Sequence, residues 1–480
     1  MEQKSIKKNY IYNTTFQIVA LLLSVITIPY VSRVLGADNV GKYSFSFSIV
    51  SYFTIIATYG SSLFGQRQIS FHRDDAERLS ESFWNLFAFR VIASAAMMCC
   101  YFVFLSLRGG VNVVNIIMAL NLVAIATDIN WLFQGLELFR QVALRNMGVK
   151  ALCVLLIFLC VRSRDDLWIY TLIMCISVIG GNLAMWLSVK KYIRKPHKIR
   201  PFANFRSMTL VFLPTVATQV YMVLDKSMLG FIVGSDYLNG CYEQSEKIAR
   251  VALTIITSLG AVILPRVSNL YKKGMLEDAK YYIYKSYRFV WLLAFPMATG
   301  LAGIASILIP VFLGSGYDDG IILLEIFSML IIIVSAAYIT GLSYLLPTEQ
   351  QNVYTIAVTA SAIINLVMNA FLIRRYQAEG AAISSVTAEA IGLIIQIVYC
   401  RATGQLELRK MFDSAWKYVA SSAVMLAVII FMKQRMNTSL FSLLFITAVA
   451  SVFYFIMVIL LRDEFVIGYL KRFKTVLIKK

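Results

Sequence analysis

Residues 41–53 read GKYSFSFSIVSYF, and residues 240–251 read GCYEQSEKIARV. Three residues recur in and just after these stretches at one constant offset of 199 residues: Gly41 and Gly240, Tyr43 and Tyr242, and Arg67 and Arg266. An offset of this length spans six membrane helices, so both copies would enter a bilayer in the same direction. The duplication predicts two parallel six-helix bundles related by an axis along the membrane normal. In transporters built this way, the substrate path lies at the bundle interface.

Composition places the rest of the chain in a membrane as well. Of the 480 residues, 59% are hydrophobic and 15% are charged, whereas a soluble domain has about 45–50% apolar and about 25% charged residues. Apolar runs of roughly 20–25 residues, separated by charge, Gly and Pro, predict about fourteen membrane helices. The expected spans are 10–34, 42–65, 82–107, 113–136, 142–161, 167–189, 207–233, 241–265, 283–309, 321–346, 352–373, 379–400, 414–432 and 439–461. The predicted fold class is an all-α polytopic membrane protein.

These spans divide the chain into four parts. We expect an N-terminal six-helix bundle at 1–192, a basic cytoplasmic linker at 193–206, a C-terminal six-helix bundle at 207–402, and two additional membrane helices with a basic cytoplasmic tail at 403–480. The connecting loops are short, so none is expected to hold an independent catalytic domain.

The charge balance is strongly basic, with 45 Lys and Arg against 26 Asp and Glu and a formal net charge of +19. In a soluble chain this excess would suggest a nucleic-acid partner. In a membrane protein it reflects the accumulation of Lys and Arg in cytoplasmic loops. The basic residues gather in alternate loops, above all in 190–206. This pattern predicts that both termini are cytoplasmic and that no nucleic acid is bound.

No pattern typical of catalysis or metal binding occurs in the sequence. The seven cysteines lie in or beside apolar runs, and none has a metal-type spacing with a histidine. There is no Gly-x4-Gly-Lys-Ser/Thr motif, and no Ser/His/Asp or paired-carboxylate arrangement can be assembled. We therefore expect the protein not to be an enzyme and to use no cofactor.

Charged residues inside the predicted spans are the candidate functional residues. A charge near the bilayer centre costs roughly 2.5–3.5 kcal/mol on insertion scales, so it normally faces a cavity or a partner. The cations selected on this basis are Arg90, Lys226, Lys247 and Arg250, and the acids are Asp128 and Asp225.

The span at 241–265 is the most highly charged. Glu243, Lys247 and Arg250 follow an i, i+4, i+7 pattern and share one helical face. Two interpretations remain open for this face. The carboxylates of Glu243 and Glu246 neutralise the two cations, or Lys247 and Arg250 present positive charge to a cavity.

Several segments, in their order along the chain, resemble the polysaccharide repeat-unit flippases of the Wzx type. They are IPYVSRVLGADNVGKYSFSFSIVSYF at 28–53, YGSSLFGQRQIS at 59–70, DINWLFQGLELFR at 128–140, LDKSMLG at 224–230 and LPRVSNLY at 264–271. That family belongs to the multidrug/oligosaccharidyl-lipid/polysaccharide exporter superfamily. The resemblance extends from residue 1 to about residue 400, and the last two spans match less distinctly.

The resemblance implies a substrate and a mechanism. The substrate would be an undecaprenyl-pyrophosphate-linked oligosaccharide, moved by alternating access from the inner to the outer leaflet of a bacterial plasma membrane for capsule, O-antigen or exopolysaccharide synthesis. A cationic cavity supplied by Arg90, Lys226, Lys247 and Arg250 would bind the diphosphate. The membrane potential, worth about 2.3 kcal/mol per charge per 100 mV, would drive the anion outward. Asp128 and Asp225 are candidates for coupling to H⁺ or Na⁺.

Two alternatives remain open. A cation-coupled multidrug antiporter of the same superfamily should have twelve spans and an acidic cavity. A surface-polysaccharide polymerase should have a large extracytoplasmic loop with catalytic residues. A polymerase and the chain-length machinery are also expected partners of a flippase, besides its lipid-linked substrate and the surrounding lipids.

Overall fold

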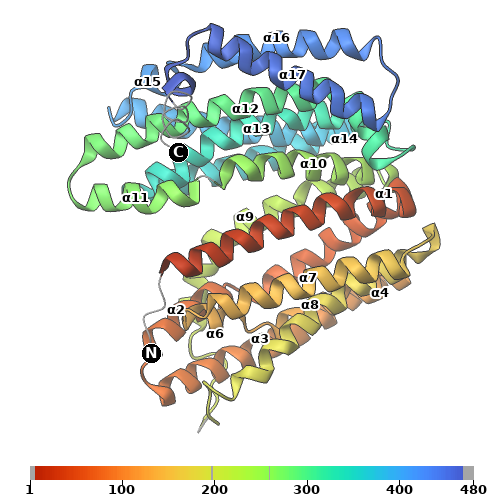
Figure 1. Cartoon of the computed structure of the whole chain (residues 1–480). Helices are drawn as coiled ribbons and strands as arrows, with labels where there is room; N and C mark the ends of the chain where they lie inside the picture. Colours follow the sequence, from red (N-terminus) through yellow and green to blue (C-terminus); the bar gives the residue numbers. More distant parts are fainter. Residues whose placement is uncertain (1–5, 196–197, 259, 469–480) are drawn as a thin grey trace, which may run out of the picture. The chain divides into compact units, whose positions relative to one another are not determined.

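The computed structural model of the chain describes residues 6–195, 198–258 and 260–468 (Figure 1). The regular elements within these residues are all helical, which confirms the predicted all-α class. The basic tail beyond residue 468 and positions 196–197 of the predicted linker lie outside the described residues.

The helices form two compact units. The first unit comprises Met1–Phe231 and Ser235–Gly240. Its elements are α1 (Ile6–Thr58), α2 (Ser61–His72), α3 (Ala76–Arg108), α4 (Val113–Met118), α5 (Leu120–Thr127), α6 (Asn130–Gly135), α7 (Phe139–Cys160), the 3₁₀ turn η1 (Arg164–Asp166), α8 (Leu167–Val189), α9 (Phe205–Ile232) and the first turn of α10 (Asp236–Thr257).

The second unit comprises Ile232–Gly234 and Cys241–Lys480. After the rest of α10, its elements are α11 (Gly260–Lys272), α12 (Leu276–Leu313), α13 (Gly320–Thr340), the π-helical turn η2 (Gly341–Leu345), α14 (Gln351–Ala402), α15 (Leu408–Phe412), α16 (Ala415–Lys433) and α17 (Leu440–Leu460). The predicted boundary at 193–206 differs from this division, because α9 follows that linker and still lies in the first unit. The four-part division stays a prediction.

Two helices are about twice as long as one membrane crossing requires, and each breaks at one residue. The 53-residue α1 breaks at Gly36, where φ is 77° and ψ is 168°. The 52-residue α14 breaks at Gln377, where φ is 48° and ψ is −124°. Glycine adopts a positive φ without a Cβ clash, whereas glutamine does so under strain. Each break falls between two predicted spans, so each long helix contains two of them.

By length and composition, the described residues contain ten helices able to cross a membrane, or eleven if α9, which bends by 61°, is counted as one. α10 is not among them, because four charged residues fall within positions 243–250. Reaching fourteen would require α10 and both arms of α1 and α14 to cross. The count of fourteen therefore stays a prediction.

The last two membrane helices belong to the core of the second unit. α16 and α17 pack against each other and against α12, which also packs against α13 (Figure 1). The buried hydroxyl of Tyr454 in α17 donates a hydrogen bond of 2.7 Å to the carbonyl of Leu292 in α12. Trp291 Nε1 donates one of 2.8 Å to the carbonyl of Met411 in α15. These bonds tie the segment beyond the duplication to the repeat-derived helices.

In the first unit, α1 and the first turn of α10 touch through the repeated glycines. A Cβ on Gly41 would lie 2.6 Å from the carbonyl carbon of Asp236, and one on Gly240 would lie 2.8 Å from that of Ala37. Residues 37 and 236 are themselves related by the offset of 199, so the contact is reciprocal.

Candidate functional site

α10 carries its charged residues as two ion pairs within one helix. Lys247 Nζ lies 2.7 Å from Glu243 Oε1, and Arg250 Nε lies 2.6 Å from Glu246 Oε1. The i, i+4 spacing predicted both pairs, because residues four apart are neighbours on a helix surface.

The two partners of each pair differ in exposure. The Glu243 and Glu246 side chains are each 9% exposed, whereas Lys247 is 37% and Arg250 is 45% exposed. The buried carboxylates therefore hold the two cations at the surface of the helix. The charges are paired, and the two cationic groups remain partly accessible. That they face a cavity stays a prediction.

Arg90 and Asp128 form a buried ion pair in the first unit. The Arg90 side chain is 0% exposed. Its Nη2 donates to Asp128 Oδ2 at 3.1 Å, and its Nη1 donates to the Asp128 carbonyl at 2.9 Å. From the sequence, these two residues are expected to have separate roles. The structure brings them together, so in this conformation each is neutralised by the other.

A second arginine joins this pair through an amide. Asp128 Oδ1 accepts a hydrogen bond of 2.6 Å from Asn130 Nδ2, and Asn130 Oδ1 accepts one of 2.8 Å from Arg145 Nη2. Arg145 Nη1 donates to Asn182 Oδ1 at 3.2 Å. The network links α3, α6, α7 and α8. Arg145 is not among the candidate residues expected from the sequence. The polar residues at 128 and 130, directly after an apolar helix, were the available signal for this network.

Asp225 and Lys226 lie in α9, in the first unit, and both are half-buried. Both have interactions with other residues of the chain. The Lys226 carbonyl accepts a hydrogen bond of 3.1 Å from Asn239 Nδ2. The next residue, Ser227, is hydrogen-bonded to the Tyr52 hydroxyl at 2.6 Å. α9 is thereby joined to α1 and to the start of α10. Lys247 and Arg250 belong to the second unit.

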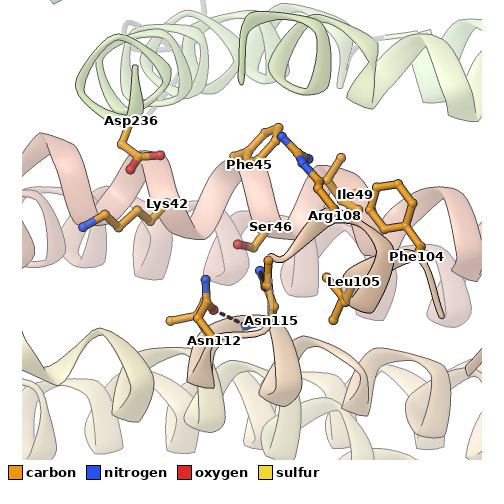
Figure 2. Close-up of a pocket in the computed structure, with 12 residues that line it drawn as sticks. Lys42, Phe45, Ser46, Ile49, Phe104, Leu105, Arg108, Asn112, Asn115 and Asp236 are labelled. Carbon is orange, nitrogen blue, oxygen red and sulfur yellow. Dashed lines mark hydrogen bonds between the residues drawn. The ribbon is translucent and has the colours of Figure 1, made fainter. Parts of the chain in front are cut away.

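A cavity of about 290 Å³ lies in the first unit beside the glycine contact (Figure 2). Two exposed cations line it, Lys42 from α1 and Arg108 from the end of α3. The guanidinium carbon of Arg108 lies 5.1 Å from the ring centroid of Phe45 and 4.2 Å from that of Phe231. Such cation–π contacts orient the guanidinium.

The cavity also contains one carboxylate, that of Asp236 (Figure 2). Burial raises its pKa, Lys42 opposes the shift, and Asp38 adds to it. Lys42 and Arg108 are not among the candidates expected from the sequence, because those candidates are charges well inside the predicted spans. Their position at neighbouring helix ends on one predicted side of the membrane was the available signal.

Metal binding finds no support in the described part of the chain, where no group of three or more His, Cys, Asp or Glu side chains has the geometry to hold a metal ion.

Comparison with known proteins gives a family match over more than half of the chain. The profile of the polysaccharide biosynthesis protein family matches residues 6–271. A proposed O-antigen transporter of Escherichia coli (strain K12) is 23% identical over 406 residues, which are 83% of this chain and 97% of that protein. A flippase proposed to act in low-salt glycan biosynthesis in Haloferax volcanii is 23% identical over 246 residues, which are 50% of this chain and 51% of that protein.

Solved structures show the fold. The lipid II flippase MurJ, in an inward closed conformation, superposes with a TM-score of 0.76 at 14% identity and covers 92% of this chain and 98% of its own. An inward-facing multidrug transporter of the MATE family superposes with a TM-score of 0.59 at 11% identity, covering 80% of this chain and 94% of its own. The chain thus shares its fold with a lipid II flippase and with a multidrug transporter.

Proposed function

Since the chain belongs to the polysaccharide biosynthesis protein family, we propose that it is a flippase for lipid-linked oligosaccharides. It moves undecaprenyl-pyrophosphate-linked repeat units from the inner to the outer leaflet of the bacterial plasma membrane by alternating access. The product supplies the synthesis of a surface polysaccharide such as O-antigen or capsule.

The observation that carries this proposal is agreement between two independent comparisons. The proposed O-antigen transporter matches over nearly its whole length. The fold of the lipid II flippase covers more of this chain, at a higher TM-score, than that of the multidrug transporter. One is named as an O-antigen transporter and the other as a lipid II flippase, and neither is named as a polymerase. The multidrug and polymerase alternatives therefore have less support.

Lys247 and Arg250 are our proposed ligands for the diphosphate. Their carboxylate partners are buried, so the cationic groups are held in place without being covered. A diphosphate oxygen can then bind as a second partner and form a short, charge-assisted hydrogen bond. Lys226, in the first unit, stays a predicted ligand for the diphosphate.

Arg90 can bind a phosphate group only if Asp128 releases it. A proton or a Na⁺ ion that neutralises the Asp128 carboxylate would remove the main counter-charge of Arg90. We propose this exchange as the coupling step of the first unit, with Asp225 as the second candidate for a coupling ion. The membrane potential adds roughly 4–5 kcal/mol per 100 mV for outward movement of a dianion.

Depletion of the protein tests the proposed function. In protoplasts that lack it, the lipid-linked oligosaccharide should accumulate and stay protected from an added glycosidase or lectin until the cells are lysed. If the oligosaccharide is instead accessible from outside but unpolymerised, the protein acts after translocation, and the polymerase alternative is favoured.

Charge-neutral variants test the proposed ligands. The double variant Lys247→Gln/Arg250→Gln should lose translocation at normal membrane abundance. The matched control is Lys272→Gln/Lys273→Gln, which removes the same charge from two exposed residues at the end of α11. Full translocation by the first variant, or an equal loss in the control, would contradict the assignment.

A further inference from the structure

The second unit contains a larger cavity, of about 580 Å³, that the proposed transport does not use. It lies between the first turns of α12 and the segment around α15, next to Phe465 after α17. Its volume falls within the range of about 300–1,000 Å³ that is typical of small-ligand sites. Because α15 and Phe465 follow the duplicated part of the chain, the twelve-helix repeat alone would not form this cavity.

Four cations and two carboxylates line the cavity. Two cations are paired: Arg288 Nη2 lies 2.9 Å from Asp413 Oδ2, and Lys410 Nζ lies 2.6 Å from Glu407 Oε1. The other two cations are Lys285 and Arg409. Within the part of the chain that the structure describes, neither of these two has an ion pair. The cavity is therefore cationic, with two positive groups left to bind an anion.

The surroundings of the cavity suit a membrane surface. Tyr281 lines the cavity and is 60% exposed, and Trp416 at the start of α16 is 58% exposed. Exposed Tyr and Trp side chains are typical of the membrane–water interface. Basic segments next to membrane helices are attracted to anionic lipids, and basic pockets between such helices bind lipid head groups.

We propose that this cavity binds the phosphate group of an anionic phospholipid, with Lys285 and Arg409 as its direct ligands. Arg288 and Lys410 are held by their carboxylates and shape the two sides of the site. The bound lipid joins α12 to α15 and so fixes the C-terminal helices to the rest of the second unit. This inference does not depend on the proposed transport, because it concerns a lipid of the membrane and not the cargo.

Thermal stability of the purified protein in neutral detergent tests the site. Phosphatidylglycerol should raise the unfolding midpoint of the full-length protein, whereas phosphatidylcholine should not. The variant Lys285→Gln/Arg409→Gln should need about tenfold more phosphatidylglycerol, or still more, for the same shift. The variant Lys285→Arg/Arg409→Lys keeps both charges and should respond like the unchanged protein, which separates loss of binding from loss of folding.

Two further arms identify the ligand. The variant Lys272→Gln/Lys273→Gln loses the same charge outside the cavity and should keep the response to phosphatidylglycerol. If this variant loses the response as much as Lys285→Gln/Arg409→Gln does, the lipid is attracted to the charged surface in general, and the proposal is wrong. Glycerol 3-phosphate without lipid should have no effect. If it stabilises the protein as well as phosphatidylglycerol does, the site binds a soluble phosphate and the lipid assignment is wrong. An unchanged midpoint with phosphatidylglycerol would also overturn it.

Discussion

Replacing Gly41 with alanine tests the close contact between α1 and the first turn of α10. The added Cβ would lie 2.6 Å from the carbonyl carbon of Asp236 and 2.8 Å from the amide nitrogen of Gly240. Carbon atoms in favourable contact are about 3.5–4.0 Å apart, so the two helices must separate by about 1 Å or more. Both neighbours are backbone atoms, so no side-chain rotation relieves the clash.

Overpacking of this kind costs about 1–3 kcal/mol. For a unit of this size, that cost should lower the thermal midpoint by about 2–12 °C. Gly240→Ala should have a similar effect, because its Cβ would lie 2.8 Å from the carbonyl carbon of Ala37. The double variant should cost less than the sum of the single ones, because the first separation makes room for the second methyl group.

The measurement is the thermal midpoint of purified protein, with translocation as a second readout. Gly180→Ala in α8 is the matched control, because nothing lies within 4 Å of its added Cβ. Alanine there should be neutral or slightly stabilising, since it favours a helix more than glycine does. If Gly41→Ala is as harmless as Gly180→Ala, or if the two glycine variants are additive, the reciprocal contact is not as close as argued.

Three other perturbations have defined outcomes. Asp128→Ala should destabilise the protein by about 3–5 kcal/mol, because it leaves the Arg90 charge buried and unpaired. The double variant Arg90→Met/Asp128→Leu should destabilise it much less. Equal thermal midpoints for the two variants would contradict the pairing. The raised pKa of Asp236 means that its ionised form is disfavoured in the folded state, so Asp236→Asn should raise the thermal midpoint at pH 8. This gain should vanish as the pH falls toward 3.8, the ordinary pKa of the group, and a gain that persists at that pH would refute the proposed cause. Gln377→Gly should stabilise α14 by about 1 kcal/mol by relieving the positive φ, and a lower midpoint would show that the glutamine side chain itself is required.

The sequence by itself determined the features that depend on composition and on local spacing. Membrane insertion follows from the excess of apolar residues, and every predicted span lies on helical segments of the structure. The pairs Glu243–Lys247 and Glu246–Arg250 were predictable because both partners of each pair lie on one helix. The repeat identified Gly41 and Gly240 as equivalent. The family resemblance is confirmed by the profile match over residues 6–271.

Only the tertiary structure decided which distant groups meet. Arg90 and Asp128 are 38 residues apart, and the helices of the first unit bring them into contact. Arg145 meets Asn130 and Asn182, although its position near a helix start suggested a solvated loop charge. The cavity of the second unit brings residues 285 and 409 together. Periodicity along a helix gives the residues on each face, but it does not give the face of another helix that packs against them, because that depends on long-range packing of the whole unit.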